Sequence, residues 1–395
     1  MRKELKLYFA ILALTAFALG ITSNVISNFF KDAYDVTAYQ RGFLEFPREL
    51  PGIISIFVIA GLSFLSDIRI SIIAQVLSFI GIAILGFTTP TYNVMILLVF
   101  INSMGMHLFF PLQDSIGLDL AEKDNIGKRL GQFKGFFTGV QMLAAMFVFW
   151  GFREGFMSFE TPFKLTFVIA AAMFLAIIIM LVVLERWVRI DKPHVKQNGY
   201  VFRKAYKYYY VLIILFGVQK QIMMVYGPWV LIDLLSKKAD TISILTVIGS
   251  FIGIFFIPAV GKWLDRFGVR KLLFADAISF IGVYLVYGLL CVGYINGSIQ
   301  TAGLGVVLAY AIFIIDRMSS QMGIVRTVYL RKIAIMPSDI TPTLTLGQSM
   351  DHAVSIVCAY LGGVIWSLWG PQYIFFIAAG FSLINLYVAF KVHVK

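Results

Sequence analysis

The sequence has few charges, few histidines and almost no cysteine. Only 14% of its 395 residues are charged, and it contains 4 His and 2 Cys. Two cysteines inside long apolar runs do not make a disulfide framework, and four scattered histidines without a Cys pair give no metal-ligand set. A phosphate-binding Gly loop followed by Lys-Ser/Thr and a nucleophile elbow are also missing. These absences argue against an enzyme, and no metal or cofactor is expected.

Hydrophobic residues, in contrast, make up 59% of the chain, and the mean hydropathy is +0.86. A helix needs about 20 apolar residues to cross a bilayer, and twelve runs approach or exceed that length. They predict membrane-spanning helices at residues 7–30, 42–65, 70–87, 93–118, 135–152, 163–184, 208–234, 241–260, 272–294, 301–322, 343–369 and 372–390. The expected fold class is therefore an all-α polytopic membrane protein with twelve transmembrane helices.

The net charge of +12 is spread unevenly over the segments between these spans. With a cytoplasmic N-terminus, 25 of the 33 Lys and Arg fall on cytoplasmic segments and 6 on outer segments, while Arg48 and Lys220 lie inside spans. Lys and Arg accumulate on the cytoplasmic side of membrane proteins, where they face anionic lipid. We therefore expect a monomeric, multi-pass protein of the cytoplasmic (inner) membrane, with both termini cytoplasmic. The lipid bilayer is the expected partner, and no nucleic acid is.

The one substantial charged segment lies in the middle of the chain. It covers residues 186–207 and separates two halves of six predicted spans each. Two halves of similar hydropathy are typical of transporters built by duplication. We predict an N-terminal six-helix bundle (1–185), a cytoplasmic linker (186–207) and a C-terminal six-helix bundle (208–395).

A short charged turn separates the eighth and ninth predicted spans. It reads Gly261-x-x-x-Asp265-Arg266-x-Gly268-x-Arg270-Lys271. Gly261 would let a neighbouring helix approach closely, and Gly268 would allow a tight reversal of the backbone. Asp265 would accept hydrogen bonds at a helix N-terminus, where the helix dipole favours an anion.

This turn, at its position after the eighth of twelve spans, resembles the signature loop of the major facilitator superfamily. The resemblance implies the superfamily's fold of two six-helix bundles and secondary transport by alternating access. It also implies that the loop contacts the start of the fifth span, near residues 128–132, and acts as a conformational latch. The equivalent first-half segment, residues 63–69, keeps the acid at Asp67 but lacks the leading Gly and the Gly-x-Arg-Lys tail. An alternative is that the basic residues only enforce topology.

A charged residue in mid-membrane costs about 2.5 to 3.5 kcal/mol on insertion scales and therefore indicates a candidate site. Lys220 lies near the middle of the seventh predicted span, between Gln219 and Gln221. Tyr226 follows, with a Gly-Pro pair that can kink the helix. If the superfamily architecture holds, this span lines the central cavity, so these side chains are candidates for binding an anionic substrate. The alternative is a permanent ion pair with an acid of a neighbouring helix.

Other polar residues in predicted spans extend this candidate set. Asp351 in the eleventh span is a candidate for proton coupling, with Arg326 or Arg317 as its partner. The adjacent His352 can titrate near neutral pH, although a single His is more often a packing residue. Further candidates for substrate contact are Asn102, His107 and Gln141.

The second predicted span begins with Glu45, Arg48 and Glu49 on one helical face. A local ion pair would leave one carboxylate over, and burial would make that carboxylate a possible proton carrier. Because these residues lie only a turn or two from the outer surface, the alternative is an outer gate or a solvated pair.

Together these features predict a secondary active transporter of a small organic solute, working as a symporter or an antiporter. Lys220 favours a polar or anionic substrate, and a proton is favoured over sodium as the coupling ion. Two alternatives stay open. One is a multidrug or lipid exporter that uses the abundant Phe and Met as an adaptable apolar cavity, and the other is a non-transporting membrane sensor or scaffold.

Overall fold

A computed structural model of the chain describes residues 2–62, 64–120, 126–188 and 202–392. Over these residues the protein is helical, and no strand occurs among them. Contacts between residues divide the chain into two compact units. The first comprises Met1–Asp35, Pro47–Lys196 and Lys238–Ile244, and the second comprises Val36–Phe46, Gln197–Lys237 and Leu245–Lys395. The predicted division into bundles at residues 1–185 and 208–395 stays a prediction, as does the linker, of which residues 189–201 lie outside the described part.

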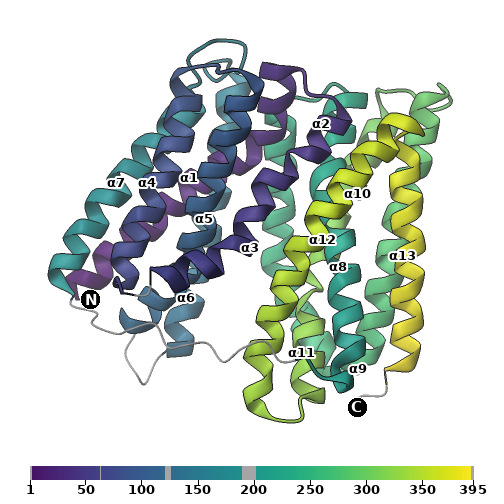
Figure 1. The fold of residues 1–395 in the computed structure, drawn as a ribbon. Helices are drawn as coiled ribbons and strands as arrows, with labels where there is room; N and C mark the ends of the chain where they lie inside the picture. The colour runs from purple at the N-terminus through teal and green to yellow at the C-terminus, as the bar shows by residue number, and fades with distance from the viewer. Residues whose placement is uncertain (1, 63, 121–125, 189–201, 393–395) are drawn as a thin grey trace. The chain divides into compact units, whose positions relative to one another are not determined.

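The first unit is built from long helices. They are α1 (Lys3–Tyr34), most of α3 (Glu45–Gly61), α4 (Asp67–Phe87), α5 (Tyr92–Leu120), α6 (Ile126–Arg153) and α7 (Leu165–Trp187). α4 packs against α5 and α7, and α1 packs against α6 and α7 (Figure 1). Small residues bring α4 and α5 together, since a Cβ on Gly105 would lie 2.3 Å from the Ala74 carbonyl oxygen. Close backbone approach of this kind is how apolar helices associate in a membrane.

The second unit contains more, and shorter, elements. They are α2 (Ala38–Phe43), η2 (Lys204–Tyr206), α8 (Lys207–Trp229), η3 (Val230–Leu234), most of α9 (Ala239–Ile295), α10 (Leu304–Gln321), α11 (Ile324–Ile333), η4 (Pro337–Asp339), α12 (Ile340–Leu368) and α13 (Pro371–Lys391). α8 packs against α12 and α13, and α12 packs against α2. α9 also contacts α8, because the hydroxyls of Tyr284 and Tyr287 donate hydrogen bonds of 2.8 Å to the carbonyls of Gln219 and Gly227. α8 is therefore central to this unit.

Ten helical segments of the described chain are long and apolar enough to cross a membrane. One of them, α9, has 57 residues and holds Gly268 at φ 80° and ψ 165°, so it consists of two helical stretches. α3, with 17 residues, covers most of the second predicted span. Each of the twelve predicted spans coincides with a helical stretch, which confirms the all-α membrane fold.

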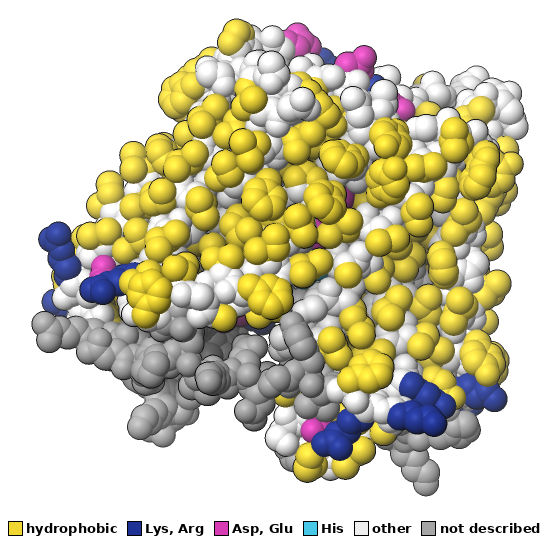
Figure 2. Space-filling model, viewed as in Figure 1, with side chains coloured by type: hydrophobic (Ala, Val, Ile, Leu, Met, Phe, Trp, Pro, Cys, Tyr) yellow, Lys and Arg dark blue, Asp and Glu magenta, His cyan; other side chains and the backbone are white. Residues whose placement is uncertain are grey.

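The helices carry hydrophobic side chains on their outer faces. On α9, for example, the side chains of Phe251 and Phe255 are 56% and 66% exposed. Figure 2 shows hydrophobic side chains along the helices, and it shows Lys and Arg at the end of the second unit where α13 ends. A bilayer-facing surface has this composition, since lipid tails solvate apolar side chains and head groups attract positive ones.

Candidate functional site

An ion pair between α8 and α12 lies within the membrane-spanning part of the second unit. The Lys220 ammonium donates a hydrogen bond to Oδ2 of Asp351, and the two side chains are 30% and 23% exposed. The other carboxylate oxygen, Oδ1, is buried and has no hydrogen-bond partner among the described residues. A Cβ on Gly217 would lie 2.8 Å from this oxygen, so a larger residue there would displace the carboxylate. The pair is thus charge-balanced, partly accessible and incompletely hydrogen-bonded.

The expected partners of Asp351 are engaged elsewhere. Arg326 forms a buried ion pair with Asp276, with 2.5 Å between Nη2 and Oδ2. Its Nε also donates to the Leu212 carbonyl at 3.3 Å, and its guanidinium lies 4.2 Å from the centre of the Phe216 ring. The expected pairing of Asp351 with Arg326 is therefore replaced by the pairing with Lys220. The role of Arg326 in substrate binding stays a prediction.

The polar residues on either side of Lys220 point to different neighbours, because successive residues of a helix are rotated by about 100°. Gln219 is fully buried against α13, where its amide donates to the Ser382 hydroxyl at 2.5 Å and accepts from Asn385 at 3.0 Å. Gln221 instead donates to Oε2 of Glu45 at 3.1 Å. The three side chains therefore do not form one site.

Glu45 belongs to a second buried ion pair of the same unit. Its partner is Arg41, with 2.5 Å between Nη1 and Oε1, and both side chains are at most 1% exposed. Helical spacing grouped Glu45 with Arg48 and Glu49, and Arg41 was not among the candidates. The spacing of four residues between Arg41 and Glu45 was the signal that could have identified this pair.

Tyr226 closes the space between α8, α2 and α12. Its hydroxyl donates to the Ala359 carbonyl, and its ring stacks on Trp366 with 5.8 Å between the ring centres. The helix distortion expected from the Gly-Pro pair is present directly afterwards, since Val230–Leu234 form a π-helical turn. Proline lacks a backbone N–H donor, and helices are commonly distorted at prolines and at π-helical turns.

In the first unit, the candidates Asn102 and His107 are held by hydrogen bonds within that unit. The Asn102 amide donates to the Ser78 carbonyl at 3.4 Å. Nδ1 of His107 lies 2.9 Å from the Ser103 carbonyl oxygen, and the Ser103 hydroxyl donates to the Arg48 carbonyl at 2.5 Å. α3 and α5 are therefore joined at this level of the unit.

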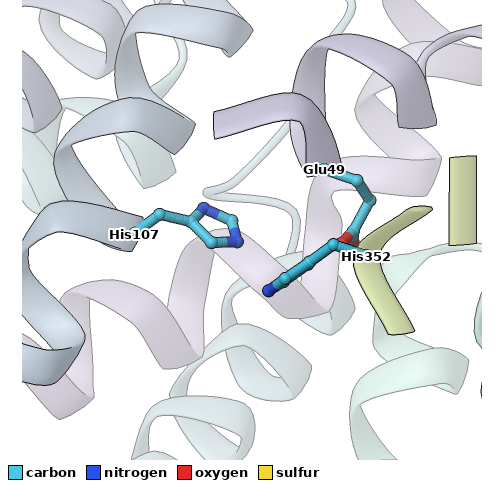
Figure 3. Close-up of side chains that lie close together, drawn as sticks. All are labelled: Glu49, His107 and His352. Atoms are coloured by element: carbon cyan, nitrogen blue, oxygen red, sulfur yellow. The ribbon is translucent and has the colours of Figure 1, made fainter. Parts of the chain in front are cut away.

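Glu49 and His107 face one another from α3 and α5. A carboxylate oxygen of Glu49 and a ring nitrogen of His107 lie within 4.8 Å (Figure 3). His352, drawn in the same figure, belongs to α12 of the second unit. The remaining candidate, Gln141, packs its backbone against Gly20 of α1, where a Cβ would lie 3.2 Å from the Gln141 carbonyl oxygen. The roles of these residues in transport stay predictions.

A cavity of about 230 Å³ lies between α1, α5 and α6 of the first unit. Four aromatic residues line it, together with Asp114 and Lys134 as charged groups. None of the residues proposed from the sequence lines this cavity, because their selection rested on mid-span polarity and not on helix adjacency.

The signature loop is well formed around Gly268. The positive φ of this glycine lies in a region that residues with a Cβ avoid, which confirms the expected reversal of the backbone. Among the described residues, no atom lies within 4 Å of a Cβ placed on Gly261, so its expected close contact with a neighbouring helix stays a prediction. Asp265 is exposed, and it lines a cavity of about 410 Å³ beside Arg266 and Lys332.

The other basic residues of the loop contact the end of the same unit. Arg270 donates to the Phe390 carbonyl at 3.2 Å, and the Lys271 ammonium lies 6.0 Å from the centre of the Phe267 ring. The expected contact of the loop with residues 128–132 cannot be followed, since the side chains of residues 126–131 are not among those described. The latch therefore stays a prediction.

The corresponding acid of the first unit has a different environment. Asp67 is the first residue of α4, and the Ser66 side chain caps this helix by accepting a hydrogen bond from the Arg69 amide at 3.3 Å. Asp67 is 7% exposed, and its Oδ2 accepts a hydrogen bond of 2.5 Å from Ser115 on α5. The preceding Ser63 lies outside the described residues.

A third acid, Asp339, anchors the loop between α11 and α12 in the second unit. It accepts a hydrogen bond of 2.6 Å from the Tyr206 hydroxyl and pairs with Arg203 at 2.8 Å. The Tyr206 hydroxyl and the Arg203 guanidinium hold the pKa of Asp339 below its usual value. Asp339 was not among the candidates from the sequence, because those were chosen as charged or polar residues inside predicted spans and Asp339 lies in a loop.

Comparison with known proteins identifies a family. Residues 8–337 match the model of the Major Facilitator Superfamily. No curated protein matches the chain by sequence.

Several solved transporters share the fold over nearly their whole length. A mutant form of the nucleoside transporter NupG has a TM-score of 0.79 at 16% identity, covering 98% of this chain and 99% of that chain. The POT family transporter PepTSo has a TM-score of 0.75 at 10% identity, covering 99% and 97%. A bacterial homologue of the iron transporter ferroportin has a TM-score of 0.72 at 12% identity, covering 96% and 98%. At these identities the likeness concerns the fold alone.

Proposed function

Because the chain belongs to the Major Facilitator Superfamily, we propose that it moves a small polar or anionic organic solute by proton-coupled alternating access. Membership of this family and the membrane-spanning helices make the protein a multi-pass membrane transporter and not an enzyme. The substrate class, the coupling ion and the residues that bind them are the content of the proposal. Family membership also favours transport over the alternative of a non-transporting sensor or scaffold.

The Lys220–Asp351 pair is the observation that carries the proposal. An ion pair in a membrane-spanning region needs both partners, because removing either leaves an uncompensated charge. When no solute is bound, the charges of Lys220 and Asp351 neutralise each other. An anionic solute group can take the place of the carboxylate at Lys220, since the ammonium is 30% exposed and accessible.

Charge balance then links the solute to a proton. When a monoanion binds Lys220, the net charge of the site changes from zero to minus one. Protonation of Asp351 restores it to zero, and a neutral carboxyl group tolerates the membrane interior far better than an unpaired carboxylate. The proposal is therefore one proton taken up at Asp351 for each monoanion bound at Lys220.

The distribution of charge supports the proposed location and orientation. Lys and Arg are concentrated on the segments assigned to the cytoplasm, and basic residues end α7, α11 and α13. We propose that the protein lies in the cytoplasmic membrane with both termini inside, as the positive-inside rule requires.

Flux into proteoliposomes tests the proposal. Thermal stabilisation of the purified protein by a panel of monocarboxylates, dicarboxylates, phosphorylated sugars, amino acids and nucleosides would select the solute. Uptake of that solute is expected to rise with an inward proton gradient. Uptake that ignores the proton gradient would remove proton coupling.

Lys220→Ala is expected to abolish this uptake while the protein is still made and inserted. The matched control is Lys204→Ala, which removes an exposed lysine just before α8 and should leave uptake unchanged. Normal transport by Lys220→Ala would show that the assignment of Lys220 to the substrate site is wrong.

A further inference from the structure

Asp316 on α10 is a buried acid that the proposed function does not use. Its side chain is 6% exposed, and its Oδ1 has no hydrogen-bond partner among the described residues. No Lys, Arg or His among the described residues forms a salt bridge with Asp316. An ionised carboxylate in such a place would be exceptional, because buried charges in proteins are paired.

The other buried acids of the second unit follow that rule. Arg41 lies 2.5 Å from Glu45, Arg326 lies 2.5 Å from Asp276, and Arg203 lies 2.8 Å from Asp339. Each of these three carboxylates therefore has a guanidinium in contact. Asp316 differs from all of them in having none among the described residues.

The groups that face Asp316 are already occupied. From α9, Tyr284 and Tyr287 interact with it electrostatically, but both hydroxyls donate to carbonyls of α8. Asp276 also acts on Tyr284, and it is paired with Arg326. Neither tyrosine hydroxyl is therefore free to donate to Asp316, and the cation beside Asp276 is already paired.

Arg317, the next residue of α10, is the remaining cation near Asp316. Its side-chain carbons lie 3.5 Å from the position of a Cβ on Gly249. Its guanidinium is 5.1 Å from the centre of the Phe313 ring. Adjacent residues of a helix point about 100° apart, so Arg317 is directed along another face of α10.

We infer that Asp316 holds a proton in this conformation and is a second protonation site of the transport cycle, separate from the Lys220–Asp351 pair. The carboxylic acid releases its proton to water when a conformational change admits water to the side chain, and takes it back on return. The part of this inference that concerns transport rests on the proposed function. The protonation itself does not.

Infrared spectroscopy of the purified full-length protein in lipid tests the protonation directly. At neutral pH, the difference spectrum between wild type and Asp316→Asn is expected to contain the C=O band of a carboxylic acid, which shifts in heavy water. A difference spectrum that contains carboxylate bands instead would overturn the inference. Asp35→Asn, which alters an exposed acid, should leave the carboxylic acid band unchanged.

Asp316→Glu serves as a second variant. It keeps the titratable group, so its carboxylic acid band should persist at a shifted frequency. If Asp316→Asn does not fold, the frequency shift in Asp316→Glu decides whether Asp316 is protonated. An unshifted band would show that the signal comes from another acid and would overturn the inference. An amide has nearly the size of a carboxylic acid, so Asp316→Asn is expected to unfold at the temperature of the wild type.

Transport stoichiometry tests the part in the cycle. With the solute selected above, Asp316→Asn is expected to lower the number of protons moved per solute by one, while Asp316→Glu keeps the wild-type number. An unchanged number in Asp316→Asn would exclude Asp316 from the cycle. If the wild type moves no solute of the panel, the proposed function fails, whereas the infrared result still stands.

Discussion

Asp67 in the first unit and Asp265 in the second occupy corresponding places after the second and eighth predicted spans, but their surroundings differ. Asp67 is 7% exposed and accepts a hydrogen bond of 2.5 Å from Ser115. Asp265 is exposed, and no hydrogen bond to its side chain occurs among the described residues. The second-half loop matches the signature motif more fully, yet the first-half acid is the one held in place.

The difference shows that agreement with the sequence motif and packing of the acidic side chain are separate properties. The second-half loop keeps its glycine at a positive φ, which fixes the backbone, whereas its acid is available for a partner. The first-half loop lacks the motif's glycines and instead fixes its acid by a cap and a hydroxyl. We therefore expect substitutions in the first half to act on stability through the acid, and those in the second half through the backbone.

Gly268→Ala is expected to have the largest effect, a loss of about 2–3 kcal/mol of unfolding free energy, because its φ and ψ lie in a region that is almost confined to glycine. Gly261→Ala is the matched control, since a Cβ there meets no atom of the described residues within 4 Å. It should be neutral, or stabilising by up to about 1 kcal/mol, as alanine favours helix more than glycine does. Unfolding in mixed detergent micelles measures both, and equal losses would contradict the comparison.

Asp67→Ala is expected to lower the unfolding free energy by about 2 kcal/mol, because it removes a charged acceptor and leaves the Ser115 hydroxyl unsatisfied. Ser115→Ala should cost less, and the double variant should cost less than the sum of the two. A double-mutant cycle on the same unfolding measurement gives this coupling. Strict additivity would show that the two side chains do not interact.

Asp339 makes part of the stability of the second unit depend on pH. Its folded-state pKa is below the usual value, so its contribution is fully present above the unfolded pKa of about 3.9. That contribution is lost as the pH falls from there through the folded pKa. Unfolding temperature measured from pH 6 to pH 3 should fall less steeply for Asp339→Asn than for the wild type, and parallel curves would exclude this role.

Asp265→Asn is expected to have the smallest effect on stability, within about 0.5 kcal/mol, as for other exposed positions. If the loop acts as a latch, the same variant should nevertheless change the rate of solute exchange in proteoliposomes. A loss of stability as large as that of Asp67→Ala would show that Asp265 is anchored like its first-half counterpart.

Several features of the site were predictable from single residues. Lys220 was selected by the cost of a charge in mid-membrane, and the structure places a counter-ion beside it. The Gly-Pro pair after Tyr226 predicted a distortion of the helix, and Val230–Leu234 form a π-helical turn. Asp316 lies near the end of the predicted span 301–322, and its burial without a salt bridge among the described residues was found only in the structure.

The partners of these residues were harder to predict from the sequence. Arg326 was one of two expected partners of Asp351, but it is paired with Asp276. Glu45 was grouped with Arg48 and Glu49, and the structure adds an ion pair with Arg41. Gln219 and Gln221 were grouped with Lys220, although the helix directs them toward α13 and Glu45. In each case the sequence singled out a polar residue, and its contacts were found only in the structure.

The sequence by itself determined the class of fold and the break in the helix at Gly268, because hydropathy and glycine conformation are local properties of the chain. Only the tertiary structure decided which charges neutralise one another. Lys220 and Asp351 are 131 positions apart, and their contact depends on α8 and α12 packing together. Since the energy of a buried charge depends on what lies within a few ångströms of it, that energy cannot be assigned before the helices are placed.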